Sequence, residues 1–378
     1  MDLICFSHIR WDFVYQRPQH LLTRFAFYNR VFIIEESLLD GKSNYYDIVD
    51  QKENNVFVIK LYLSRELHED QKDDMIRRLI DAFMSAKNIH QYILWYYTPM
   101  ALAYSGHLQP KLTVYDCMDE LSAFKFAHPE LKKYEARLFS LADLVFTGGH
   151  SLYEAKKHLH QNIYPFPSSI DKAHFVTARN ELTQPADQKD IPYPRIGFYG
   201  VIDERLHIKL IEQMADMRPD WHFILIGPVI KIDPATLPQR NNIHYLGGKE
   251  YQELPVYLSG WDIAMLPFEI NESTKYISPT KTPEYLAGGK PVISTPITDV
   301  VNPYGQKGLV HIADNATGFI DAAEKIFACR DNKAWLKAVD EFLADMSWNN
   351  TWHQMSELME NALAKKSIDL VPKIKAYV

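Results

Sequence analysis

The chain has 378 residues, of which 47% are hydrophobic and 24% are charged, and its formal net charge is −7. These proportions are ordinary for a globular protein, and the length is too great for one compact core, so we expect two domains. The negative charge argues against a general nucleic-acid binder, because such proteins are usually basic.

Short apolar segments alternate with helical patterns in the first half of the chain. The predicted strands, which are rich in β-branched or aromatic residues, cover 3–7, 31–35, 56–61, 92–97, 112–116 and 144–147. The predicted helices cover 18–28, 70–86, 129–141 and 151–160. This alternation is typical of an α/β domain with a parallel sheet between helices, and we assign residues 1–172 to it.

Two polar segments of the first half directly follow predicted strands. Residues 7–25, SHIRWDFVYQRPQHLLTRF, hold an unusually dense set of polar and aromatic side chains. Residues 114–124, VYDCMDELSAF, place Asp116, Asp119 and Glu120 at the end of another strand. Since open α/β sheets bind ligands at the carboxyl ends of their strands, both segments are site candidates. Asp116 could equally be a turn or helix cap.

A polar, proline-dotted segment at 171–194 indicates the connection to a second α/β domain, which we place at 190–346. Its predicted strands cover 195–199, 222–226, 243–246, 263–266, 292–294 and 309–312. Its predicted helices cover 206–217, 251–259, 283–287, 316–329 and 333–345. A last helix at 347–364 carries an apolar stripe at helical spacing, and residues 347–378 form it and the tail.

The segment 278–296, SPTKTPEYLAGGKPVISTP, reads as a polar turn, a helix and a buried strand. Thr280 or Thr282 can cap the helix, and Pro283 suits its first turn. A helix N-terminus attracts phosphate, Lys281 stands beside that end, and Glu284 follows within one turn. A lysine for a diphosphate and a carboxylate for sugar hydroxyls fit a nucleotide-sugar. The alternative is an ordinary amphipathic helix with a solvated lysine.

Glycines end several predicted strands of the second half, at Gly200, Gly227 and Gly247. A glycine at a strand end lets the backbone approach a phosphate closely. Arg205 and Tyr251 lie in the loops that follow the first and third of these strands. The alternative is a plain strand-to-helix turn with an exposed arginine.

The end of the 278–296 segment resembles the donor-site signature E-x-x-A-x-G-x-P-V-I of GT-B glycosyltransferases. The matching residues are Glu284, Ala287, Gly289, Pro291, Val292 and Ile293. The family pattern has a second glutamate further upstream, whose position is occupied here by Tyr276. The Ser-Pro-Thr-Lys form and the run RWDFVYQRPQHL look like features of bacterial cell-surface glycosyltransferases.

This resemblance implies the GT-B fold: two tandem doubly wound Rossmann-like domains, with a C-terminal helix that crosses back to the first. It implies donor-binding roles for Gly200, Arg205, Gly227, Gly247, Tyr251, Ser278, Thr280, Lys281 and Glu284. The first domain would then hold the acceptor, with Arg10, Trp11, Asp12 and Arg17 beside it. Asp119, with His8 in reserve, is the candidate catalytic base that an inverting enzyme requires.

The implied activity is transfer of a sugar from a nucleoside diphosphate, with UDP preferred, to a glycan or lipid-linked acceptor in surface polysaccharide synthesis. Alternatives are a nucleotide-sugar epimerase on the same fold and a catalytically silent nucleotide-sugar-binding protein. A dehydrogenase is disfavoured because no G-x-G-x-x-G run follows a first strand.

We expect no cofactor and no metal, since the family generally stabilises the diphosphate with helix dipoles and basic side chains. The three cysteines, Cys5, Cys117 and Cys329, are too scattered for a disulfide framework or a metal site. The first strand begins almost at Met1, and no apolar run approaches the ~20 residues that span a bilayer. We therefore expect a cytoplasmic protein; the segment 133–139 and the tail lysines Lys365, Lys366, Lys373 and Lys375 are compatible with peripheral contact to the inner face of the plasma membrane.

Overall fold

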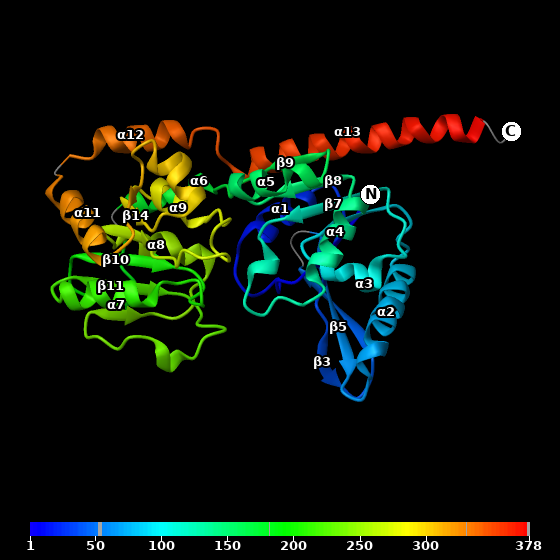
Figure 1. Cartoon of the computed structure of the whole chain (residues 1–378), viewed down its shortest axis with the longest axis horizontal. Coiled ribbons are helices and arrows are strands. Elements are labelled where there is room, and N and C mark those ends of the chain that lie inside the picture. The colour runs from blue at the N-terminus through cyan, green and yellow to red at the C-terminus, as the bar shows by residue number, and fades with distance from the viewer. Residues whose placement is uncertain (52–54, 181, 330, 376–378) are drawn as a thin grey trace. The chain divides into compact units, whose positions relative to one another are not determined.

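The computed structural model describes residues 1–51, 55–180, 182–329 and 331–375 of the chain. It divides the chain into two compact units. Unit 1 holds residues 1–148, 152–167 and the C-terminal segment from 349, and unit 2 holds 149–151 and 168–348. Each unit is built on its own mainly parallel sheet with helices packed against it (Figure 1). The predicted α/β class is confirmed.

The sheet of unit 1 has the strand order β3-β5-β2-β1-β6-β7-β8-β9, with β4 paired to β5. Its strands are β1 (Asp2–Ser7), β2 (Val31–Glu35), β3 (Leu38–Gly41), β4 (Tyr45–Gln51), β5 (Val56–Ser64), β6 (Tyr92–Tyr96), β7 (Leu112–Cys117), β8 (Leu144–Thr147) and β9 (Ile163–Pro165). The central strands are buried along their whole length, which explains their continuous apolar sequences. The strand order reverses direction between β1 and β6, so a site is expected at their carboxyl ends.

The helices associated with unit 1 are α1 (Arg17–Phe25), α2 (Lys72–Ala86), α3 (Leu102–Ser105), α4 (Leu131–Leu141), α5 (His150–Lys156) and α13 (Trp348–Lys375). α2 shows why these segments are helical, since Ile76, Ile80, Phe83 and Met84 form one buried face at helical spacing. α1 begins with a reciprocal cap between Gln16 and Gln19, in which the Gln16 backbone N–H donates to Gln19 Oε1 at 3.0 Å.

The C-terminal helix α13 packs on unit 1, as expected (Figure 1). Trp352 meets the edge of Phe25, with ring centroids 6.2 Å apart, and stacks on Tyr28 at 5.9 Å. Further along, Lys366 forms a 2.7 Å ion pair with Asp143. The helix is longer than the predicted one at 347–364, since it continues to Lys375. The last buried residue of its apolar stripe is Met359.

The strands β3 and β4 are absent from the sequence prediction. β4 runs antiparallel to β5, with Tyr45 opposite Tyr62 and Gln51 opposite Val56. Its sequence, YYDIVDQ, contains two aspartates and is partly exposed, so it lacks the continuous apolar run of a buried parallel strand. Pairing with the well-formed strand β5 is what makes this segment extended.

The sheet of unit 2 has the parallel order β12-β11-β10-β13-β14-β15, and its strands agree closely with the predicted ones. They are β10 (Arg195–Tyr199), β11 (His222–Ile226), β12 (Ile243–Tyr245), β13 (Ile263–Leu266), β14 (Val292–Ser294) and β15 (His311–Ile312). The helices are α6 (Lys172–Val176), α7 (Ile208–Met217), α8 (Leu254–Ser259), α9 (Lys281–Ala287), α10 (Thr298–Val300), α11 (Ala316–Ala328) and α12 (Lys333–Phe342). Here the strand order reverses between β10 and β13.

The segment 171–194 is more than a connection, because it packs into unit 2. Phe175 and Ala178 belong to the apolar core of that unit, with exposures of 0% and 2%. Gln188 is fully buried and accepts a 2.9 Å hydrogen bond from the indole N–H of Trp261. The polar, proline-rich composition of the segment did not indicate that these few residues are buried in unit 2. Within the described ranges, no helix is both long and apolar enough to cross a membrane.

Candidate functional site

Three predicted donor-site glycines lie side by side at the carboxyl edge of the sheet in unit 2. Gly200 follows β10 and donates its N–H to Ile226 O at 2.8 Å. Gly227 follows β11 and donates to Gly247 O at 2.8 Å. All three have positive φ, at +140°, +146° and +70° for Gly200, Gly227 and Gly247. This backbone region is open chiefly to glycine, so the residue type is required by the local geometry.

The closest approach is between the first two glycines. A Cβ added to Gly227 would lie 1.8 Å from the carbonyl oxygen of Gly200. A Cβ added to Gly200 would lie 2.2 Å from Cε of Lys281. The loops after β10 and β11 and the start of α9 therefore meet without room for side chains at either glycine.

Lys281 is the first residue of α9 and reaches the backbone of Gly200. Its Nζ lies 5.7 Å from the centre of the Phe198 ring and 6.0 Å from that of Phe268. Phe198 lies near the end of β10, and Phe268 lies two residues after β13. The order of the sheet reverses between these two strands. This is the place where open α/β sheets bind ligands. The lysine thus sets a positive charge at the expected position.

The predicted helix cap is wrong. Thr280 occupies the N-cap position, but it has helical backbone angles and its side chain makes no capping hydrogen bond. The hydroxyl of Thr282 is buried and has no hydrogen-bond partner among the described residues. The turn is instead held by Ser278, whose carbonyl oxygen accepts a 2.6 Å hydrogen bond from the Ser168 hydroxyl.

Glu284 lies one turn into α9, and only 5% of its surface is exposed. The hydroxyl of Tyr199, the last residue of β10, donates to Glu284 Oε2 at 2.8 Å. Burial raises the pKa of the Glu284 carboxyl to about 7, although the Tyr199 hydrogen bond and the Lys281 charge both lower it. The carboxyl group therefore changes charge near neutral pH.

Two further predicted donor residues are held by neighbours from other loops. The Arg205 guanidinium forms an ion pair with the buried carboxylate of Asp203, with Nη2 2.7 Å from Oδ2. The ring of Tyr251 stacks on His174 at 4.7 Å, and His174 Nε2 lies 3.0 Å from Tyr251 O. Sequence reasoning missed both Tyr199 and His174. The former ends a buried strand, and the latter lies in the segment interpreted as a linker.

In unit 1, the catalytic candidates follow two strands near the reversal point of the sheet. His8 follows β1 directly, and Asp119 lies two residues beyond β7; both are partly buried. The residue after Asp119, Glu120, forms a 2.8 Å ion pair with the buried Lys156. The ion pair of Glu120 therefore holds the loop that carries Asp119.

Two further acceptor-side candidates, Arg10 and Trp11, bind Glu35, which ends β2. Its carboxylate binds Nη1 of Arg10 at 3.0 Å and accepts from the Trp11 backbone N–H at 2.8 Å. Asp12 is exposed and lies 3.6 Å from Lys60. This loop after β1 is therefore anchored by a carboxylate of the neighbouring strand.

Arg17 has a different place from the one predicted, because it lies inside unit 1 with 4% exposure. Its guanidinium donates to both carboxylate oxygens of Asp116, at 2.8 to 3.1 Å, and its Nη1 donates to Phe166 O at 2.6 Å. Through these contacts the Arg17 side chain joins α1, β7 and Phe166, the residue after β9. Asp116 is correspondingly the partner of a buried ion pair and not a helix cap.

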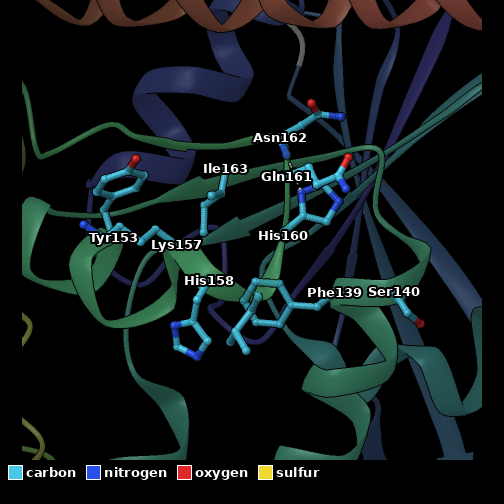
Figure 2. Close-up of a pocket in the computed structure, with 10 residues that line it drawn as sticks. Phe139, Ser140, Tyr153, Lys157, His158, His160, Gln161, Asn162 and Ile163 are labelled. Atoms are coloured by element: carbon cyan, nitrogen blue, oxygen red, sulfur yellow. Dashed lines mark hydrogen bonds between the residues drawn. The ribbon is translucent and has the colours of Figure 1, made fainter.

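A shallow hollow of about 700 Å³ is present elsewhere on unit 1 (Figure 2). Its lining residues are Phe139, Ser140, Tyr153, Lys157, His158, Leu159, His160, Gln161, Asn162 and Ile163. Most of these residues precede β8 or β9, so the hollow lies at the amino-terminal edge of the sheet. The candidates Asp119 and His8 lie at the opposite edge. Across the described part of the chain, no three His, Cys, Asp or Glu side chains are grouped to hold a metal ion.

Part of the chain matches a known family in sequence, and the whole chain is similar to solved structures in fold. Residues 193–329 match the family described as "Glycosyl transferases group 1". "Putative teichuronic acid biosynthesis glycosyltransferase TuaH" of Bacillus subtilis (strain 168) is 24% identical over 303 residues, covering 73% of this chain and 74% of that protein.

Among solved structures, sucrose-phosphate synthase (tll1590) from Thermosynechococcus elongatus has a TM-score of 0.70 at 15% identity, covering 97% of this chain and 100% of that one. Anabaena Alr3699/HepE in complex with UDP gives 0.67 at 13% identity, with 96% and 100% covered. The glycosyltransferase WaaG gives 0.62 at 11%, with 94% and 99% covered. The chain therefore has the GT-B fold, and the match of residues 193–329 to the group 1 glycosyl transferases supports a transferase.

Proposed function

We propose that this protein transfers a sugar from a nucleoside diphosphate donor, with UDP as the preferred nucleotide, to a glycan or lipid-linked acceptor in surface polysaccharide synthesis. The observation that carries the proposal is the position of Lys281 against Gly200, with Glu284 one turn further along α9. All three residues fall within the matched glycosyl transferase domain. The relative named for teichuronic acid biosynthesis and the neighbour bound to UDP support the choice of pathway class and nucleotide.

On the donor side, Lys281 would neutralise the diphosphate, and the glycine loops would let backbone N–H groups approach it. As a carboxylate, Glu284 would accept hydrogen bonds from ribose hydroxyls. Stabilising the charge that develops on the leaving diphosphate is the main catalytic demand in such a transfer. We propose that these groups meet that demand without a metal ion.

On the acceptor side, Asp119 is the proposed base, with His8 in reserve. If the reaction inverts the sugar, one of these groups would accept the proton of the attacking hydroxyl while the bond to the diphosphate breaks. If the reaction retains the configuration, Asp119 would instead help to bind the acceptor. Arg10, Trp11 and Asp12 would supply further contacts, whereas Arg17 acts from the interior through Asp116.

Peripheral contact with a membrane is the finer part of the proposal. Leu141 at the end of α4 and Leu159, which lines the hollow, are 48% and 46% exposed. The exposed Lys133 also belongs to α4, and the exposed Lys157 lies two residues before Leu159; each forms an ion pair with a glutamate three residues earlier in the chain. Apolar side chains flanked by cations suit an anionic lipid surface. On α13, Lys366 is paired with Asp143, and the side chains of Lys373 and Lys375 lie outside the described residues.

The experiment is a nucleotide-release assay on the purified protein. UDP-sugars and GDP-sugars are incubated with and without a lipid and glycan extract of bacterial envelopes, and free nucleotide is measured. Release that depends on both a UDP-sugar and the extract is expected. Interconversion of UDP-sugars without extract would favour the epimerase, and nucleotide-sugar binding without turnover under any condition would favour the silent binding protein.

A further inference from the structure

Tyr199 is a buried tyrosine whose hydroxyl points at the proposed ribose-binding carboxylate. It ends β10, and 3% of its surface is exposed. Its hydroxyl donates to Oε2 of Glu284 at 2.8 Å, from a strand to a helix 85 residues away in sequence. A buried hydroxyl that donates to a carboxylate makes a strong, directional bond, because no water competes for either group.

The tyrosine is itself held firmly. Its backbone N–H donates to the Tyr285 hydroxyl at 3.0 Å, and the two rings meet edge to face at 4.7 Å. Trp261 lies 5.9 Å from the Tyr199 ring on another side. The packing of these rings, which phenylalanine at position 285 would keep, fixes the direction of the Tyr199 hydroxyl.

The hydrogen bond leaves one carboxylate oxygen of Glu284 for another donor. The Tyr199 hydroxyl donates to Oε2, so this bond leaves Oε1 as the oxygen that can accept from another donor. A glutamate has three rotatable side-chain bonds, so an unheld carboxylate would spread over several rotamers. Fixing one oxygen sets the direction in which the other can accept.

We propose that Tyr199 is a positioning residue, which holds Glu284 so that its second oxygen accepts a hydrogen bond from a ribose hydroxyl of the donor nucleotide. The inference rests on the proposed function, because it assumes that Glu284 binds the ribose. It adds a specificity element that the donor motif at 278–296 does not contain.

The test compares Tyr199→Phe with the matched control Tyr285→Phe. Each variant removes one buried hydroxyl from the same cluster, but the Tyr285 hydroxyl bonds the Tyr199 backbone and not Glu284. Calorimetry measures the affinity of the full chain for UDP, 2′-deoxy-UDP and 3′-deoxy-UDP. Tyr199→Phe should weaken UDP by about 10-fold, and Tyr285→Phe should stay within about 2-fold of the wild type.

The deoxy nucleotides separate positioning from general support of the fold. For the deoxy nucleotide that lacks the hydroxyl bound by Glu284, Tyr199→Phe should lose less than about 2-fold, because the contact it organises is already missing. An equal loss for UDP and both deoxy nucleotides, or no loss for UDP, would overturn the inference.

Glu284→Gln distinguishes this inference from the proposed function. Weaker UDP binding in Glu284→Gln with unchanged binding in Tyr199→Phe overturns the role of Tyr199 alone. Unchanged binding in both variants, or no UDP binding by the wild type, overturns the ribose role of Glu284 and the inference with it.

A second substitution keeps the test sharp if Tyr199→Phe does not fold. 3-Fluorotyrosine at position 199 keeps the ring and the hydroxyl but donates a stronger hydrogen bond. The charged or titratable groups that act on Glu284 are Tyr199, Lys281 and the neighbouring Tyr285. A stronger hydrogen bond should lower the pKa of the Glu284 carboxyl. UDP affinity should fall when this carboxyl takes up a proton, so the fall should occur at a lower pH. An unmoved profile would contradict the inference.

Discussion

The carboxyl edges of the two sheets hold their loops in place by different means. In unit 1, the strand-end carboxylates Glu35 and Asp116 each bind an arginine, Arg10 or Arg17, from the loop and helix after β1. In unit 2, the loops after β10 and β11 are packed through glycine backbone, with room for no Cβ at Gly227.

This difference assigns the charged groups to different tasks. The ion pair of Arg17 and Asp116 is buried, so its charges are used in organising unit 1. In unit 2, backbone hydrogen bonds join the loops after β10 and β11, and the charged pair within the first of these loops, Arg205 with Asp203, includes neither Lys281 nor Glu284. A donor site can therefore be built from them.

The largest expected effect comes from breaking the glycine contact of unit 2. Gly227→Ala should destabilise the unit by about 3 kcal/mol or more, because its Cβ would collide with Gly200 O at a φ of +146°. The melting temperature should fall by roughly 6–12 °C. Gly248→Ala is the control, since nothing lies within 4 Å of its added Cβ. Equal melting temperatures for the two variants would show that the glycine packing is not what holds these loops.

The next prediction concerns the half-buried carboxylate of unit 1. Asp119→Asn should lower turnover by about 10²-fold if Asp119 is the base of an inverting reaction, and leave UDP affinity nearly unchanged. For a retaining reaction, the loss should be smaller and should appear as weaker acceptor binding. Extract-dependent UDP release and calorimetry measure the two quantities. Asp74→Asn, on the exposed face of α2, is the control, and full activity of Asp119→Asn would remove it from the site.

Much of the fold was predictable because its strands are buried on both faces. Segments such as IGFY in β10 and FILI in β11 are continuous apolar runs that end in turns. The C-terminal helix was equally readable from its stripe of tryptophan and methionine. β4 was not, since an edge strand with Asp47 and Asp50 owes its extended form to pairing with β5.

The site was predictable only where local backbone geometry decides it. Glycines with positive φ and the short segment before α9 leave direct marks in the sequence. The pairing of Arg17 with Asp116 spans 99 residues, and that of Tyr199 with Glu284 spans 85. No spacing rule connects such positions, so the sequence could not show that Arg17 is internal or that Tyr199 supports the donor motif.

The donor-side charge provides a smaller but sharper test. Lys281→Ala should weaken UDP binding by roughly 1–3 kcal/mol, because a charge-assisted contact with the diphosphate is lost. Lys325→Ala removes an exposed lysine from α11 and should leave the affinity unchanged. Calorimetry at low and moderate salt compares the two. If both variants bind UDP like the wild type, Lys281 does not contact the diphosphate.

The smallest expected effect is that of Glu284→Gln at different pH values. It is also the most specific, because above pH 7 the substitution should raise stability and lower UDP affinity. The pKa of Glu284 is about 7 in the folded protein against an ordinary value of 4.5, so between these values the native state binds more protons than the unfolded state. Wild-type stability should therefore fall as the pH rises through this window. Glu284→Gln is neutral throughout, and at pH 8 it should melt at a higher temperature than the wild type. The difference should shrink as the pH is lowered towards 5.

UDP affinity should change in the other direction. At pH 8 the variant should bind UDP roughly 10-fold more weakly than the wild type, since the ribose loses a charged acceptor. Below about pH 7 the wild-type carboxyl takes up a proton, and its affinity should approach that of the variant. Scanning calorimetry and titration calorimetry at pH 8, 6.5 and 5 follow both quantities. A stability difference that does not vary with pH would mean that Glu284 stays ionised in the folded protein, and the loss of donor affinity in acid would then need another titrating group.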